Sequence, residues 1–107
     1  MFSERLLDHF KNPRNVGELG PPAVTVEVSN PVCGDILRLS VRFDGDRVAE
    51  ARYKVRGCTA SIAAGSALTE WLAGRSRSEL AALGAESRHA AVLCVEAVRA
   101  VLQRLPQ

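Results

Sequence analysis

Alternating hydrophobic and polar positions in the middle of the chain predict a β-hairpin. Apolar side chains stand at every second position in two consecutive runs: Leu37, Leu39, Val41 and Phe43, then Ala49, Ala51, Tyr53 and Val55. Charged or polar residues fill the intervening positions, as in strands that bury one face. Asp44-Gly45-Asp46 joins the runs, and Asp-Gly is a preferred hairpin-turn sequence. A third alternating run over residues 24–28 completes a three-stranded antiparallel sheet with one apolar face.

Helical spacing replaces this alternation towards both ends of the chain. Apolar residues recur at intervals of three and four in three segments: residues 3–11, 59–73 and about 87–105. Gly74 stands where the C-terminus of a helix favours glycine. Ser76 and Glu79 have the spacing of a capping box, so a short helix is expected to begin there. The expected fold is α+β, a single domain over residues 1–107 with helices packed on one face of the sheet.

Charge and cysteine content narrow the class of protein. A formal net charge of +2 with interspersed acids and bases predicts no nucleic-acid partner. No apolar stretch approaches the ~20 residues that span a bilayer, and the N-terminus lacks a signal-peptide pattern, so we expect no membrane association and a cytoplasmic location. Three cysteines are an odd number for a disulfide framework, which predicts free thiols that are either buried or ligating.

Two short segments carry candidate metal ligands. Cys33-Gly34-Asp35 lies in the turn before the first hairpin strand, where Gly34 allows a tight bend that aims a thiolate and a carboxylate at one point. The same tripeptide also suits an ordinary turn, and by itself it favours that interpretation. Cys58 follows the second hairpin strand at a helix N-terminus, which favours the thiolate. A small buried residue at a tight junction explains Cys58 equally well.

The last helix contains His89 and Cys94. A lone histidine near a helix start is more often a surface residue than a ligand, and Cys94 lies among apolar residues that favour packing. The sequence has no Cys-x-x-Cys pair, phosphate-binding glycine loop or nucleophile elbow. The residues alone therefore indicate a small α+β domain with a candidate thiolate–carboxylate metal site.

Four segments in order resemble the IscU/NifU-like family of iron–sulfur cluster assembly scaffolds (NifU N-terminal domain-like). They are Asp8-His9 with Asn12-Pro13-Arg14-Asn15-Val16-Gly17, then Cys33-Gly34-Asp35, then Gly57-Cys58, and then Thr69-Glu70-Trp71-Leu72-Ala73-Gly74. The resemblance spans nearly the whole chain. It implies a scaffold or carrier, not an enzyme, which accepts sulfur from a cysteine desulfurase, holds a labile cluster and passes it to acceptor apoproteins.

The resemblance also implies the ligands of the site. In the family, three cysteines and an aspartate converge at one end of the sheet; Cys33, Asp35 and Cys58 match, and His89 matches the histidine before the third cysteine. Ala90 stands where that third cysteine is expected, and Cys94 is ~6 Å further along the helix, too far to replace it. Cys33, Asp35, Cys58 and His89 remain as four expected ligands for a [2Fe–2S] cluster or for zinc.

Two further functions are compatible with this ligand set. One is a zinc-binding or sulfur-accepting relative that regulates a cysteine desulfurase; the other is a metal-free interaction module with the family's fold. Typical housekeeping scaffolds carry a Leu-Pro-Pro-Val-Lys chaperone segment where this chain has only residues 83–88, which argues against transfer by that route. The expected assembly is a monomer or weak homodimer.

Overall fold

The computed structural model describes residues 4–29, 34–85 and 92–105. Its elements follow in the order α1 (Glu4–Lys11), β1 (Val24–Ser29), β2 (Ile36–Asp44), β3 (Arg47–Arg56), α2 (Thr59–Leu72), α3 (Arg77–Ala85) and α4 (Val92–Arg104). This is the predicted order of helices and strands. The expected start of the last helix near Ser87 lies outside the described residues. Within the described segments, no helix has the length and apolar character needed to cross a membrane.

The three strands form one antiparallel sheet in the order β1-β2-β3. Val26 pairs with Leu39, and Leu39 pairs with Tyr53, so the alternating apolar residues of all three strands share one face. Asp44 pairs with Arg47, which leaves a two-residue hairpin loop. Gly45 is the first residue of that loop and has φ 62°, a conformation that glycine adopts without steric cost. The predicted hairpin is therefore confirmed.

The predicted alternation in β3 is wrong at its first position. The register shifts between Arg42 and Phe43, because Arg42 pairs with Glu50 whereas Phe43 pairs with Val48. Ala49 is consequently the extra residue of a β-bulge, and it is exposed. Val48 takes the inward position instead, with 3% of its surface exposed. A bulge inserts one residue and so shifts the alternation of inward and outward side chains. A strict period of two therefore placed Ala49 on the apolar face by mistake.

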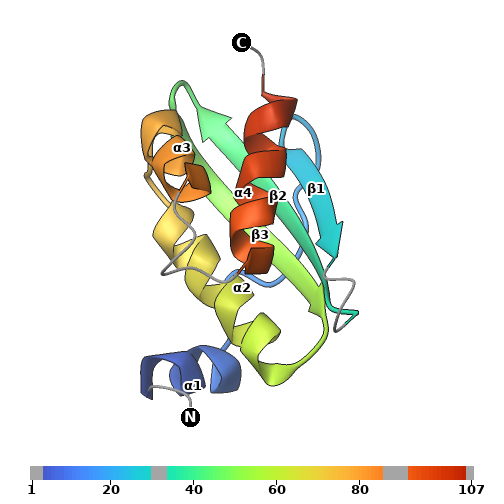
Figure 1. Ribbon diagram of the computed structural model, residues 1–107. Coiled ribbons are helices and arrows are strands. Elements are labelled where there is room, and N and C mark those ends of the chain that lie inside the picture. The colour runs from blue at the N-terminus through green and yellow to red at the C-terminus, as the bar shows by residue number, and fades with distance from the viewer. Residues whose placement is uncertain (1–3, 30–33, 86–91, 106–107) are drawn as a thin grey trace.

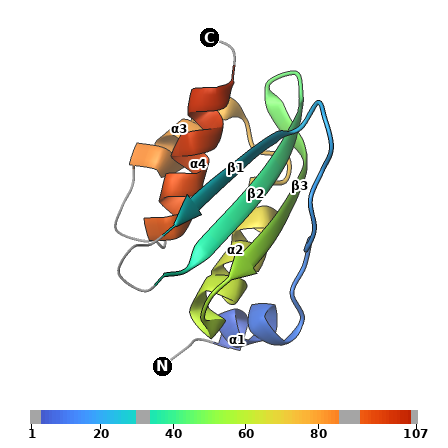
Figure 2. The ribbon, with the colours of Figure 1, turned by 90° about the vertical axis from the view of Figure 1, so that its right-hand side faces the viewer.

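Helices α2, α3 and α4 cover the apolar face of the sheet, and α1 packs across the lower part of α2 (Figures 1 and 2). Figure 2 shows the segment that follows α1 running along the outer edge of β3. The core lies between the sheet and the covering helices. Its fully buried larger side chains are Leu37, Leu39, Val41, Tyr53, Leu72, Leu80, Val98 and Val101. The expected α+β fold with helices on one face is confirmed.

The predicted helix boundaries between α2 and α3 are also confirmed. Gly74 has φ 79° just after the end of α2, and the Arg75 amide donates to the Leu72 carbonyl at 3.0 Å. The Ser76 amide donates to Glu79 Oε1 at 3.1 Å, and the Glu79 amide donates to Ser76 Oγ at 3.3 Å. These reciprocal bonds are those of a capping box.

Candidate metal and cluster site

Strand pairing places Asp35 and Cys58 side by side at one end of the sheet. Asp35 directly precedes β2, and Cys58 follows β3 and forms the N-cap of α2. Ile36 pairs with Arg56 in the register of the two strands, so the residues just beyond this pair must lie near each other. The hairpin thus brings together two candidate ligands that are 23 residues apart in the chain.

Hydrogen bonds hold the Asp35 carboxylate in a defined position. Asp35 is only 6% exposed, and its Oδ2 accepts from the Cys58 thiol at 3.2 Å. The Ser61 hydroxyl donates to the same oxygen and also lies 3.5 Å from Cys58 Sγ. Cys58 itself is exposed. The pair therefore presents a thiol to solvent beside a carboxylate that hydrogen bonds from Cys58 and Ser61 hold in place.

Glycine at position 57 is what lets the two residues approach. A Cβ atom on Gly57 would lie 2.6 Å from Asp35 Cγ, closer than non-bonded carbon atoms approach. Gly34, on the other side of Asp35, has φ 74°, which a larger residue adopts only with strain. Gly34 and Gly57, the glycines of the two candidate ligand segments, thus each allow a backbone position that a larger residue would disfavour.

The environment keeps Asp35 ionised. The hydrogen bonds from Ser61 and then from Cys58 lower the pKa of the Asp35 carboxyl below its ordinary value, against the opposing effect of burial. Cys58 lies at the N-terminus of α2, with its exposed thiol against the Asp35 carboxylate. A carboxylate and a cysteine thiolate are suitable ligands for zinc or iron.

The remaining expected ligands lie outside the described residues. Cys33 and His89 are both in undescribed segments, and so is Ala90, the position of the missing family cysteine. In the described part of the chain, no third histidine, cysteine or acidic residue joins Asp35 and Cys58 to form a metal-binding group. The structure thus brings two of the four expected ligands together, and the metal-binding roles of all four stay predictions.

Ser61 is a site residue that the sequence analysis missed. It is three residues after the N-cap Cys58, the separation at which side chains in the first turn of a helix meet the cap. That spacing was the available signal for a contact between Ser61 and Cys58. It indicates a role at the site only once Asp35 is known to lie opposite both residues. Ser61 Oγ donates to the Asp35 carboxylate and so orients one candidate ligand.

Cys94 is a packing residue, as predicted. It is 6% exposed, belongs to the hydrophobic core, and donates its thiol to the Ala64 carbonyl at 3.7 Å. Burial raises the pKa of the Cys94 thiol to about 11, so the thiol stays protonated at neutral pH. A cavity of about 90 Å³ reaches from Cys94 to the site residue Ser61, and it is lined by Leu37, Ala60, Ser61, Ala64, Leu93 and Cys94.

The N-terminal signature residues fasten α1 to α2. His9 is 5% exposed, and its Nδ1 lies 2.7 Å from Ser66 Oγ and 3.1 Å from Arg14 Nη1. Because a guanidinium only donates, Nδ1 is the acceptor, and the ring proton on Nε2 faces Glu70 Oε1 at 3.4 Å. Arg14 also pairs with Asp8 at 2.6 Å. This network joins α1 and the segment after it to α2.

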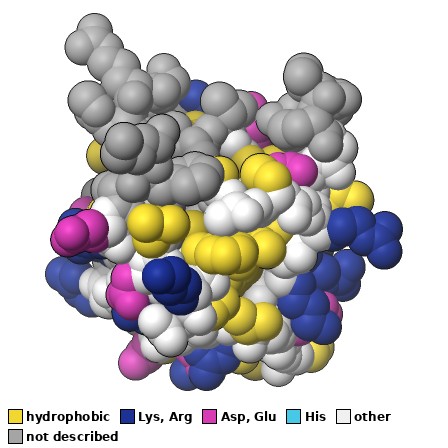
Figure 3. Space-filling model, turned by 90° about the horizontal axis from the view of Figure 1, so that it is seen from below, with side chains coloured by type: hydrophobic (Ala, Val, Ile, Leu, Met, Phe, Trp, Pro, Cys, Tyr) yellow, Lys and Arg dark blue, Asp and Glu magenta, His cyan; other side chains and the backbone are white. Residues whose placement is uncertain are grey.

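The end of the molecule that carries α1 has an apolar patch. Figure 3 views the protein from that end and shows hydrophobic side chains gathered at the centre, with basic and acidic side chains around them. Two of the exposed large hydrophobic residues belong to α1, namely Leu7 at 37% and Phe10 at 38% exposure. Such a patch is typical of a surface that meets other proteins.

The fold and this site define a small α+β domain with a cysteine–carboxylate pair at the junction of a hairpin and a helix. The whole chain, residues 1–107, matches the family described as NifU-like N terminal domain. It is 34% identical over 117 residues to the iron–sulfur cluster assembly scaffold protein IscU of Azotobacter vinelandii, covering 95% of this chain and 91% of that protein. The chain belongs to the NifU-like N-terminal domain family.

Two SufU proteins are also similar. The chain is 39% identical over 75 residues to the zinc-dependent sulfurtransferase SufU of Bacillus subtilis, covering 70% of this chain and 50% of that protein. A crystal structure of a putative iron–sulfur cluster assembly scaffold for the SUF system from Fervidobacterium islandicum matches with a TM-score of 0.70 at 26% identity, covering 78% and 61% of the two chains. Among curated relatives the matched share ranges from 16% of a bifunctional NifU/MnmA protein to 91% of IscU.

Proposed function

We propose that this protein is an iron–sulfur cluster assembly scaffold. It accepts sulfur from a cysteine desulfurase and iron from a donor, holds a labile [2Fe–2S] cluster and transfers it to acceptor apoproteins. The observation that carries the proposal is the contact between Asp35 Oδ2 and the exposed Cys58 thiol at the N-terminus of α2. Relatives named as scaffolds, including IscU of Azotobacter vinelandii, support it.

Each residue of the proposed site has a distinct task. Cys58 is exposed, so its sulfur is open to a persulfide donor and to iron. Asp35 supplies a carboxylate that binds iron less tightly than a thiolate does, which keeps the cargo exchangeable. Cys33 and His89 complete the set, with His89 in place of the thiolate that Ala90 cannot provide.

Anaerobic reconstitution tests the proposal. The protein is incubated with ferrous iron, a cysteine desulfurase and cysteine, and the iron and sulfide bound per chain are measured together with the visible spectrum. We expect a stoichiometric cluster that disappears in Cys58→Ala and persists in Cys94→Ala, because Cys58 is exposed at the site whereas Cys94 is buried in the core. Absence of a cluster in the unmodified protein, with gain of one after Ala90→Cys, would show that this chain has lost assembly.

A second candidate function is zinc-dependent sulfur transfer. The likeness to the zinc-dependent sulfurtransferase SufU of Bacillus subtilis supports it, and so does a donor set of thiolates, carboxylate and imidazole, which suits zinc as well as iron. Under this proposal the bound zinc would remain through purification, and Cys58 would accept a persulfide without cluster formation. Zinc content by mass spectrometry and persulfide labelling of the protein, each compared with Cys58→Ala, distinguish the two functions.

A further inference from the structure

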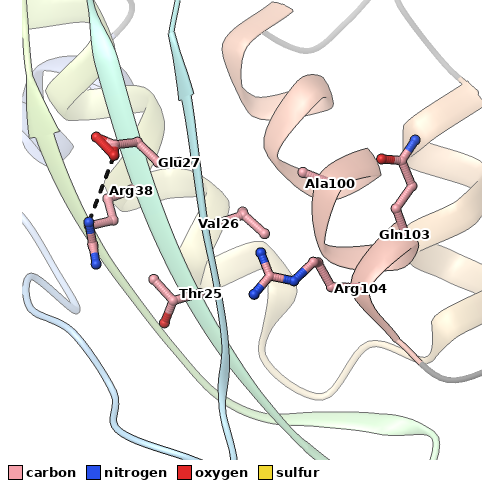
Figure 4. Close-up of a pocket in the computed structure, with 7 residues that line it drawn as sticks. All are labelled: Thr25, Val26, Glu27, Arg38, Ala100, Gln103 and Arg104. Atoms are coloured by element: carbon pink, nitrogen blue, oxygen red, sulfur yellow. Dashed lines mark ion pairs between the residues drawn. The ribbon is translucent and has the colours of Figure 1, made fainter.

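A groove lies between strand β1 and the C-terminal half of α4, on the part of the molecule away from α1. Figure 4 shows its lining residues, with Val26 pointing from β1 towards the helix and the Arg104 side chain pointing from α4 towards the strand. The groove has a volume of about 410 Å³. It is lined by Thr25, Val26, Glu27, Arg38, Ala100, Gln103 and Arg104.

The two edges of the sheet differ. The edge of β3 is covered by backbone hydrogen bonds: the Tyr53 amide donates to the Asn15 carbonyl, the Gly17 amide donates to the Tyr53 carbonyl, and the Val48 amide donates to the Arg75 carbonyl. β1 forms the other edge. Among the described residues, its backbone pairs with β2 alone. β1 therefore offers unpaired amide and carbonyl groups, and such an edge is a template for another strand.

The groove beside that edge is lined mostly by polar and charged side chains, with Val26 and Ala100 as its apolar part. Val26 is 5% exposed and faces the short side chain of Ala100 across the groove. The exposed Arg104 guanidinium forms no ion pair within the described segments, whereas Arg38 on the other side of β1 pairs with Glu18 at 2.8 Å. Gln103, the residue before Arg104, also lines the groove. The groove thus suits a strand that carries a carboxylate opposite Arg104.

We propose that β1 is a docking edge for an extended acidic segment of a partner protein. The segment adds as a strand to β1, its inward side chains enter the groove, and a carboxylate among them pairs with Arg104. Strand addition of this kind obtains affinity from main-chain hydrogen bonds and specificity from alternate side chains. A second copy of this chain is a poor occupant. Antiparallel pairing of two β1 strands would bring the two Arg104 side chains towards the two-fold axis of the dimer, where their like charges repel.

The probe for the test is a fluorescent, end-blocked heptapeptide in which threonine and valine alternate and glutamate replaces the central valine. We expect saturable binding by fluorescence anisotropy, together with NMR shifts of the amides of residues 24–29. Arg104→Gln is expected to weaken binding about tenfold or more, as loss of a charge-assisted hydrogen bond does. Arg99→Gln, the same change on the same helix but outside the groove, leaves binding unchanged.

Two altered peptides complete the design. A glutamine peptide should bind the wild-type protein as weakly as the glutamate peptide binds Arg104→Gln, and methylation of alternate backbone amides should abolish binding. Equal binding of the glutamate peptide to wild type and Arg104→Gln, or no binding of it at all, would overturn the proposal. It would also be overturned if sedimentation showed wild-type dimers that Arg104→Gln strengthens, because the occupant would then be a second copy.

Discussion

At the scale of single residues, the candidate site depends on the lack of a side chain at Gly57 as much as on the side chains that surround Asp35. Gly57 makes room for the Asp35 carboxyl, and the Cys58 thiol and Ser61 hydroxyl then fix that group. The adjacency of Asp35 and Cys58 follows from the hairpin register, and it was expected from the family resemblance. The role of Ser61 was not, because it depends on which group lies opposite it in the folded chain.

Gly57→Ala tests this steric argument. The added Cβ would lie 2.6 Å from Asp35 Cγ, so the carboxyl must move away from Cys58. We expect zinc affinity, measured by competition with a chelator, to fall about tenfold or more, because metal ligation tolerates little displacement of a ligand. Gly20→Ala is the matched control, since no atom lies within 4 Å of its added Cβ. Unchanged affinity in Gly57→Ala would contradict the proposed role of Asp35.

At the scale of helices and strands, the local signals were reliable and the non-local ones were not. The hairpin turn, the end of α2 at Gly74 and the capping box of α3 are each set within a few residues, and all were predicted. The bulge at Ala49 was missed, because a bulge is defined by its partner strand. The contact of His9 with Ser66 joins residues 57 positions apart, which no local pattern reveals.

Ser76→Ala tests the capping box of α3. The substitution removes the hydroxyl that accepts from the Glu79 amide, and loss of such a cap typically costs about 1 kcal/mol in the free energy of unfolding. Chemical denaturation measures the change. Ser78→Ala lies two residues further on, at an exposed helical position, and should change stability by less than about 0.5 kcal/mol. Equal effects of the two substitutions would exclude a capping role for Ser76.

Gly65→Ala tests the packing of α2 on the sheet. Alanine in a helix is ordinarily more favourable than glycine, by roughly 0.5–1 kcal/mol. Here the added Cβ would lie 2.5 Å from Tyr53 Cδ2, and Tyr53 is 2% exposed in the core. We expect the clash to prevail and lower the free energy of unfolding by about 1–3 kcal/mol, as overpacking does. A stabilised Gly65→Ala protein would show that α2 is packed less tightly than the structure indicates.

At the scale of the whole molecule, three carboxyl groups make the free energy of unfolding depend on pH. Hydrogen bonds from Arg14, Ser61 and Arg75 lower the pKa values of Asp8, Asp35 and Glu79, respectively. A lowered pKa in the folded state means that the unfolded state binds the proton more tightly. Each group therefore stabilises the fold above its ordinary pKa of about 4, and this contribution is lost as the pH falls through its folded-state pKa.

We accordingly expect the free energy of unfolding to be lower at pH 3 than at pH 6. Urea denaturation at the two pH values measures the difference. Glu79→Gln should reduce the difference, because glutamine does not titrate, whereas Glu96→Gln at an exposed position of α4 serves as the control. An unchanged pH dependence in Glu79→Gln would show that the bonds of Glu79 to Arg75 and Ser76 do not contribute.

The central claim is that Cys58 and Asp35 form one metal-binding site, and cobalt(II) binding tests it most directly. Cobalt replaces zinc or iron and gives a thiolate-to-metal absorption band that reports ligation by cysteine without requiring cluster assembly. If the two residues share one site, the band loses intensity in Cys58→Ala, because at most the Cys33 thiolate remains; Asp35→Asn binds cobalt more weakly, and Cys94→Ala keeps the full band. A band that is unchanged in Cys58→Ala, or abolished in Cys94→Ala, would contradict the claim.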